Sequence, residues 1–174
     1  MKIKFGISIL FAALLLFGCA RSVSRVDPNK NIDLSGRWND SDSRLVSQKM
    51  IDGLLSSDKF KEYSKAINKK PSIIVGLIRN KTSEHIDADN YVKKIELAIY
   101  NSGFADLVES DSFRDKLREE RAEQQDFSSS TSASKWGKEQ GANLMLFGEM
   151  TSETDVYNNK KVVNYITTLF LTDI

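Results

Sequence analysis

One short segment in the middle of the chain constrains its fold more than any other. Residues 72–79 read Ser-Ile-Ile-Val-Gly-Leu-Ile-Arg, an apolar run rich in β-branched side chains that directly follows Pro71. A strand with one face in water alternates apolar and polar side chains, whereas an unbroken apolar run is typical of a strand buried on both faces. We therefore predict a central strand at residues 72–79 that is covered on both sides.

Three neighbouring segments show the periodicity of amphipathic helices. Apolar residues recur at helical spacing over residues 41–56, which follow several residues able to cap a helix, and again over residues 59–68. A third apolar stripe follows Asp87 and Asp89, either of which can serve as its N-cap, and ends at Gly103, which suits the C′ position. We predict one helix for each of these segments.

The second half of the chain adds strands to this pattern. Residues 104–109 and 143–150 are short and apolar, and residues 162–171 form a long β-branched segment behind the turn residues 158–159, which predicts a hairpin. Residues 112–124 are charged nearly all round, which predicts an exposed helix. The order of these elements predicts an α/β fold: a mixed β-sheet of about four strands with flanking helices and a C-terminal β-hairpin.

The first 18 residues have the layout of a secretion signal. Two lysines supply their only charges, and the apolar run at residues 7–17 is shorter than the roughly 20 residues that a spanning helix needs. Leu-Phe-Gly-Cys at residues 16–19 resembles the bacterial lipobox, in which the signal is cut before the Cys and the Cys is acylated. We predict a signal peptide at residues 1–18 and lipidation of Cys19; the alternative is a buried thiol in an uncleaved signal anchor.

The residues after Cys19 indicate where the protein is anchored. Ala20 stands where an aspartate commonly retains lipoproteins at the inner membrane, which favours a lipid anchor on the periplasmic face of the outer membrane. The following polar stretch lacks sustained periodicity, so we predict that residues 19–38 comprise the lipidated Cys and a short flexible tether. Residues 39–174 then form a single α/β domain.

Composition excludes several classes of function. The chain has 25 Lys plus Arg against 24 Asp plus Glu, a net charge of +1, so it lacks the basic excess that drives nucleic-acid binding. One Cys and one His cannot form an intrachain disulfide or an ordinary Cys/His zinc site. No Gly-rich phosphate loop follows the predicted central strand, so nucleotide binding is not supported. We expect no metal, no cofactor, no small-molecule substrate and no catalytic residue.

The polar loop after the central strand is the best candidate for a functional surface. Open α/β sheets often place their binding sites in loops at the carboxyl ends of strands. The candidate partner-binding residues are Asn80, Lys81, Thr82, Ser83, Glu84 and His85. His85 has the surroundings of a general base, but an exposed loop His beside a helix cap fits the same pattern and is the interpretation we adopt. We interpret Trp38 as packing against the first helix, with a binding aromatic as the alternative.

With these elements placed, the chain resembles a known family, the outer-membrane lipoprotein activators of penicillin-binding proteins of the LpoB type. The similarity covers the chain from about residue 33 onward, and four segments carry it in the same order: residues 33–40, 73–86, 118–125 and 141–148. The resemblance implies a fold similar to the N-terminal domain of TolB, and it suggests that the final strand of the family is missing here.

The resemblance also implies a function. It predicts a non-enzymatic lipoprotein that binds a class A penicillin-binding protein, a bifunctional peptidoglycan synthase, and stimulates cell-wall synthesis. The membrane is then contacted only through the lipid anchor. The alternative on the same fold is a structural or assembly lipoprotein of an outer-membrane or secretion complex.

Overall fold

The computed structural model describes residues 24–27, 30–109, 111, 114–115 and 130–174. A compact unit extends from Ile32 to Ile174. The elements in this unit are α2 (Asp40–Ser56), α3 (Asp58–Ala66), β1 (Ser72–Asn80), α4 (Ala88–Ser102), β2 (Asp106–Val108), α6 (Ser130–Glu139), β3 (Leu144–Tyr157) and β4 (Lys160–Asp173). The predicted α/β fold is confirmed.

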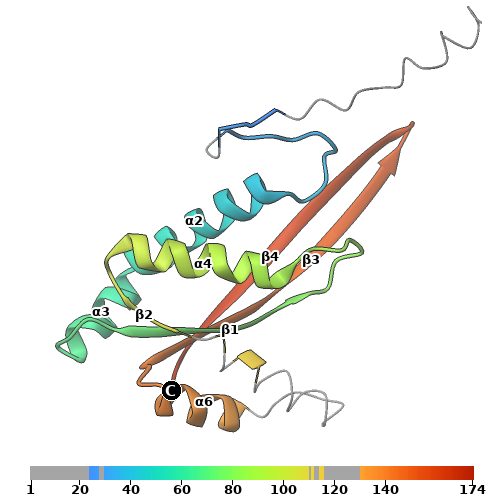
Figure 1. The fold of residues 1–174 in the computed structure, drawn as a ribbon. Helices are drawn as coiled ribbons and strands as arrows, with labels where there is room; N and C mark the ends of the chain where they lie inside the picture. The colour runs from blue at the N-terminus through green and yellow to red at the C-terminus, as the bar shows by residue number, and fades with distance from the viewer. Residues whose placement is uncertain (1–23, 28–29, 110, 112–113, 116–129) are drawn as a thin grey trace, which may run out of the picture. The chain divides into compact units, whose positions relative to one another are not determined.

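The sheet has four strands in the order β2-β1-β3-β4 (Figure 1). β1 pairs in parallel with both of its neighbours, while β3 and β4 form an antiparallel hairpin, so the sheet is mixed as predicted. Asn158 and Asn159 form the hairpin turn with φ angles of 45° and 60°, values that Asn tolerates better than most residues. β4 lies at one edge of this sheet, and the expectation of a missing final strand stays a prediction.

Helices cover both faces of the sheet (Figure 1). The larger core lies between the sheet and the helices α2, α3 and α4, and it receives Ile73 and Val75 from β1. Ile74 points the other way into a smaller core, where Trp136 of α6 packs. All three β1 side chains are fully buried, which confirms the central strand predicted from the unbroken apolar run.

The helix ends follow from local hydrogen bonding. Asn39 caps α2 and forms a capping box with Asp42, in which each side chain accepts a hydrogen bond from the other residue's backbone N–H. Of the two caps considered for α4, Asp87 is the one used: its carboxylate accepts from the backbone of Asp89 and the following residue. Gly103 ends α4 with a φ of 70°, which favours glycine. The three helices predicted around the central strand are confirmed.

One prediction is confirmed only in part: Arg114 and Asp115 are helical and Asp115 is exposed, but Arg114 is not. Residues 112–124 are expected to form an exposed helix, but Arg114 is only 3% exposed. Its Nη1 lies 2.6 Å from Oε1 of the buried Glu96 on α4, and its Nη2 pairs with Asp111. The two carboxylates allow the guanidinium to leave water, because a buried charge needs partners. Apart from Arg114 and Asp115, the segment lies outside the described residues.

Candidate functional site

The loop after β1 is organised by the first residue of the predicted partner-binding set. The Asn80 side-chain amide donates to the carbonyl oxygen of Glu84 at 2.8 Å and to that of Ile86 at 3.3 Å. Its Oδ1 accepts from the backbone N–H and the hydroxyl of Thr82, at 2.9 and 2.7 Å. Such local side-chain bonds replace the ladder bonds that a strand would supply. The loop is therefore fixed in one conformation by its own side chains.

The six predicted residues divide into an inner and an outer set. Asn80, Thr82 and Glu84 are half-buried and hold the loop, while Lys81, Ser83 and His85 are exposed. Lys81 also binds β3: its backbone N–H donates to the carbonyl oxygen of Met150 at 2.8 Å, and its Nζ pairs with Glu149 at 2.5 Å. The loop thus exposes alternate side chains while hydrogen bonds hold its backbone in place, a geometry suited to protein contact.

Tyr165 of β4 joins this loop to the segment that leads into the domain, residues 32–38, which we call the lead-in segment. The hydroxyl of Tyr165 accepts a hydrogen bond from the backbone N–H of Trp38 at 3.2 Å and forms one with the Glu84 carboxylate. Burial raises the pKa of Tyr165, the Glu84 hydrogen bond raises it further, and the Trp38 N–H lowers it. The loop and the lead-in segment therefore meet at one hydroxyl.

Trp38 fixes the lead-in segment to the domain. Its indole N–H donates to the hydroxyl of Ser43 in α2 at 2.7 Å. Its ring meets Tyr91 edge-on at a centroid distance of 5.7 Å and Tyr165 at 5.5 Å. This confirms that Trp38 packs against the first helix. The compact unit consequently begins at Ile32, earlier than the predicted domain start at residue 39.

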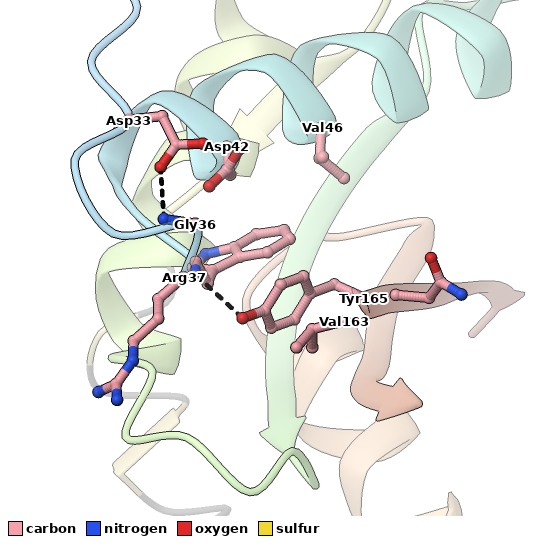
Figure 2. Close-up of a pocket in the computed structure, with 9 residues that line it drawn as sticks. Asp33, Gly36, Arg37, Asp42, Val46, Val163 and Tyr165 are labelled. Atoms are coloured by element: carbon pink, nitrogen blue, oxygen red, sulfur yellow. Dashed lines mark hydrogen bonds between the residues drawn. The ribbon is translucent and has the colours of Figure 1, made fainter. Parts of the chain in front are cut away.

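A pocket of about 310 Å³ opens beside these contacts (Figure 2). It is lined by Asp33, Gly36, Arg37, Trp38, Asp42, Val46, Val163, Asn164 and Tyr165. The lead-in segment, the first two turns of α2 and the strand β4 each contribute one wall. The lining combines two aromatic rings, two carboxylates, the guanidinium of Arg37 and two valines. Its net negative charge and its aromatic rings suit a cationic group better than an apolar one.

Sequence reasoning did not find the two residues that define this pocket. Tyr165 is one of several alternating side chains on a long strand, and nothing in its neighbourhood distinguishes it from Thr167 or Leu169. Asp42 reads as one of several acidic residues before a helix. Only Trp38 and the motif at residues 33–40 carried a signal, through the resemblance. The pocket arises from residues more than a hundred positions apart, and a local pattern does not record such proximity.

Other kinds of site are not seen in the described part of the chain. Residues 24–27, 30–109, 111, 114–115 and 130–174 contain no group of three or more His, Cys, Asp or Glu residues placed to hold a metal ion. Within the same ranges, no helix has the length and apolarity needed to cross a membrane. Cys19, the predicted lipidation site, lies outside the described residues.

Comparison with known protein families now identifies the chain. The sequence profile described as the peptidoglycan-synthase activator LpoB matches residues 42–174. The chain belongs to the LpoB family. The match runs from the first turn of α2 to the end of the chain, and the predicted resemblance to this family is confirmed. A comparison with curated proteins finds no significant match.

Three solved LpoB structures match this chain. The C-terminal domain of LpoB from Salmonella enterica has 13% sequence identity and a TM-score of 0.46, over 76% of this chain and 99% of that one. The corresponding domain from Escherichia coli has 14% identity with the same score and coverage. The NMR structure of Escherichia coli LpoB has 15% identity and a TM-score of 0.46, over 88% of this chain and 74% of that one.

Proposed function

We propose that this protein binds a class A penicillin-binding protein and stimulates its synthesis of peptidoglycan. The observation that carries the proposal is the family match, which spans nearly the whole compact unit. Activation needs no catalytic group on the activator. It requires that the lipoprotein bind the active conformation of the synthase more tightly than the inactive one, because a ligand shifts an equilibrium only by its differential affinity.

The lipid anchor belongs to the same proposal. Signal cleavage before Cys19 and acylation of its thiol would hold the protein on the periplasmic face of the outer membrane. Because the compact unit begins at Ile32, the tether consists of residues 20–31. An extended chain of that length spans at most about 40 Å. The surface of the synthase that receives the domain must therefore come close to the outer membrane.

The partner-contact surface is proposed to include the loop at residues 80–85. Lys81, Ser83 and His85 are its exposed side chains, and the hydrogen bonds of Asn80 fix the loop before any partner arrives. A fixed loop favours binding because little conformational entropy is lost when the complex forms. His85 contributes as a contact residue here, without a catalytic role.

The test is a binding measurement with the full lipidated chain in detergent and the class A synthases of the same organism. We expect saturable binding that Ser83→Ala/His85→Ala weakens. The matched control is Lys65→Ala, an exposed residue of α3, which should leave affinity unchanged. Absence of binding to every class A synthase would refute the proposal. Ring-like oligomers without synthase binding would instead support a structural role in an envelope complex.

A further inference from the structure

The pocket beside Trp38 is the right size for one side chain. Ligand pockets for whole small molecules range from about 300 to 1,000 Å³, and this one, at about 310 Å³, stands at the lower limit. Its walls come from three parts of the compact unit, and Trp38 ties two of them together through Ser43 and Tyr165. The pocket is thus preformed and small.

Its walls carry two carboxylates and one guanidinium, so their net charge is negative. One oxygen of Asp33 accepts from the backbone N–H of Gly36 at 2.8 Å, and one oxygen of Asp42 accepts from that of Asn39 at 3.0 Å. Among the described residues, neither carboxylate forms an ion pair with a basic side chain. Figure 2 shows the side chain of Arg37 extending away from both of them. Each carboxylate therefore retains an oxygen for a ligand.

The two aromatic rings complete the requirements for a cation. Trp38 and Tyr165 meet at an interplanar angle of 62°, and both border the pocket. Aromatic faces attract guanidinium groups, which also stack on them, and a guanidinium can donate two parallel hydrogen bonds to a carboxylate. The partial positive charge at the start of α2 opposes a cation, and Asp42 in the first turn counters it, whereas Asp40 is already paired with Lys94 at 2.8 Å.

From this arrangement we propose that the pocket receives one arginine side chain of the protein partner. The identification of that partner as a peptidoglycan synthase rests on the proposed function, whereas the chemistry of the pocket does not. The guanidinium lies between the Asp33 and Asp42 carboxylates and against the rings of Trp38 and Tyr165. Because Glu84 hydrogen-bonds Tyr165, the loop at residues 80–85 lies next to the pocket, and we expect both to belong to one contact surface.

The first experiment removes the charge and keeps the shape. Asp33→Asn/Asp42→Asn retains a side-chain oxygen for each backbone N–H bond, and Asp58→Asn on α3, whose side chain is 96% exposed, is the matched control. We expect the double variant to bind the synthase about tenfold more weakly, as for loss of a close charge pair at an interface, and the control to bind normally. Affinity of the double variant within twofold of the control would overturn the inference.

A second variant tests the same pocket without the risk that the first variant misfolds. Asn164→Arg places a cation at the exposed rim of the pocket, from β4, without altering the capping bonds of α2. The introduced guanidinium competes with the incoming arginine, so we expect a similar loss of affinity with an unchanged melting temperature. Normal synthase binding by this well-folded variant would count against the pocket.

The last experiment separates the pocket from the identity of the partner. The full chain is titrated with acetyl-Gly-Arg-Gly-amide and with its Gln counterpart, and the indole N–H resonance of Trp38 is followed by NMR. We expect a saturable shift with the Arg peptide only, which Asp33→Asn/Asp42→Asn abolishes. This result without any synthase binding would refute the proposed function and support the pocket. Equal responses to the two peptides would overturn the inference about the pocket, whatever the synthase does.

Discussion

Replacing Trp38 by Ala tests whether the lead-in segment is part of the folded domain. The substitution removes the hydrogen bond to Ser43 and both edge-on ring contacts, with Tyr91 and Tyr165. The backbone N–H of residue 38 can still donate to the hydroxyl of Tyr165, but the indole ring that positions this N–H is gone. If residues 32–38 were merely a tether, none of these losses would affect the stability of the domain.

The magnitude follows from the contacts. Each aromatic pair contributes about 0.5–1.5 kcal/mol beyond area burial, and the indole hydrogen bond contributes about 1 kcal/mol. Trp38 is half-buried, so the loss of apolar contact adds roughly another 1 kcal/mol. The sum is a destabilisation of about 3–5 kcal/mol. For a domain of this size, that lowers Tm by about 10 °C.

The assay is thermal unfolding of the full chain, followed by far-UV circular dichroism. Leu34→Ala is the matched control, because Leu34 belongs to the same lead-in segment but is 94% exposed. We expect the control to unfold within about 2 °C of the wild type, as most exposed substitutions do. A Tm for Trp38→Ala that equals the control value would refute the docking of residues 32–38.

Three further predictions concern charge, pH and packing. The pKa of Tyr165 is raised in the folded state, so its contribution to stability is fully present below about pH 10, the pKa of the unfolded chain. This contribution is lost as the pH rises through the pKa of the folded state. Tyr165→Phe should therefore reduce the fall in stability that denaturant titrations show above about pH 10. Glu96→Gln should lower the free energy of unfolding by about 3 kcal/mol, because it leaves Arg114 buried with less compensating charge. A decrease of less than about 1 kcal/mol would show that Asp111 alone compensates the charge of Arg114. Gly148→Ala should be strongly destabilising in a melting experiment, because a methyl group there would clash with the carbonyl oxygen of Thr168. The control is Gly53→Ala, at an open helix position, which should be neutral or stabilising.

Elements with a strong local signal could be predicted from the sequence. The apolar run of β1 indicated burial on both faces, and Asn158-Asn159 indicated the hairpin, because each pattern depends only on residues near one another. The strands of the hairpin are nonetheless longer than predicted, reaching Tyr157 and Lys160. The added residues are mainly polar and exposed, so their pairing is set by register with the partner strand and leaves no apolar pattern.

What the sequence could not predict depends on long-range contacts. Arg114 lies in a segment whose sequence predicts exposure to water, and its burial depends on pairing with Asp111 and with Glu96, which lies on a different element. Trp38 carried a local signal, but the role of Tyr165 did not, since a hydroxyl that binds both Trp38 and Glu84 requires three distant segments to converge. The predicted loop at residues 80–85 follows β1 except for Asn80, which is the last residue of that strand, and the role of the loop in partner binding stays a prediction.

The central claim is that this LpoB family member activates a peptidoglycan synthase, and the rate of glycan polymerisation tests it most directly. The full lipidated chain is added to the organism's class A synthase in detergent, and consumption of the lipid-linked precursor is followed over time. We expect a rate that rises with the concentration of the lipoprotein and saturates as binding does. An unchanged rate at concentrations where the complex is fully formed would contradict the central claim.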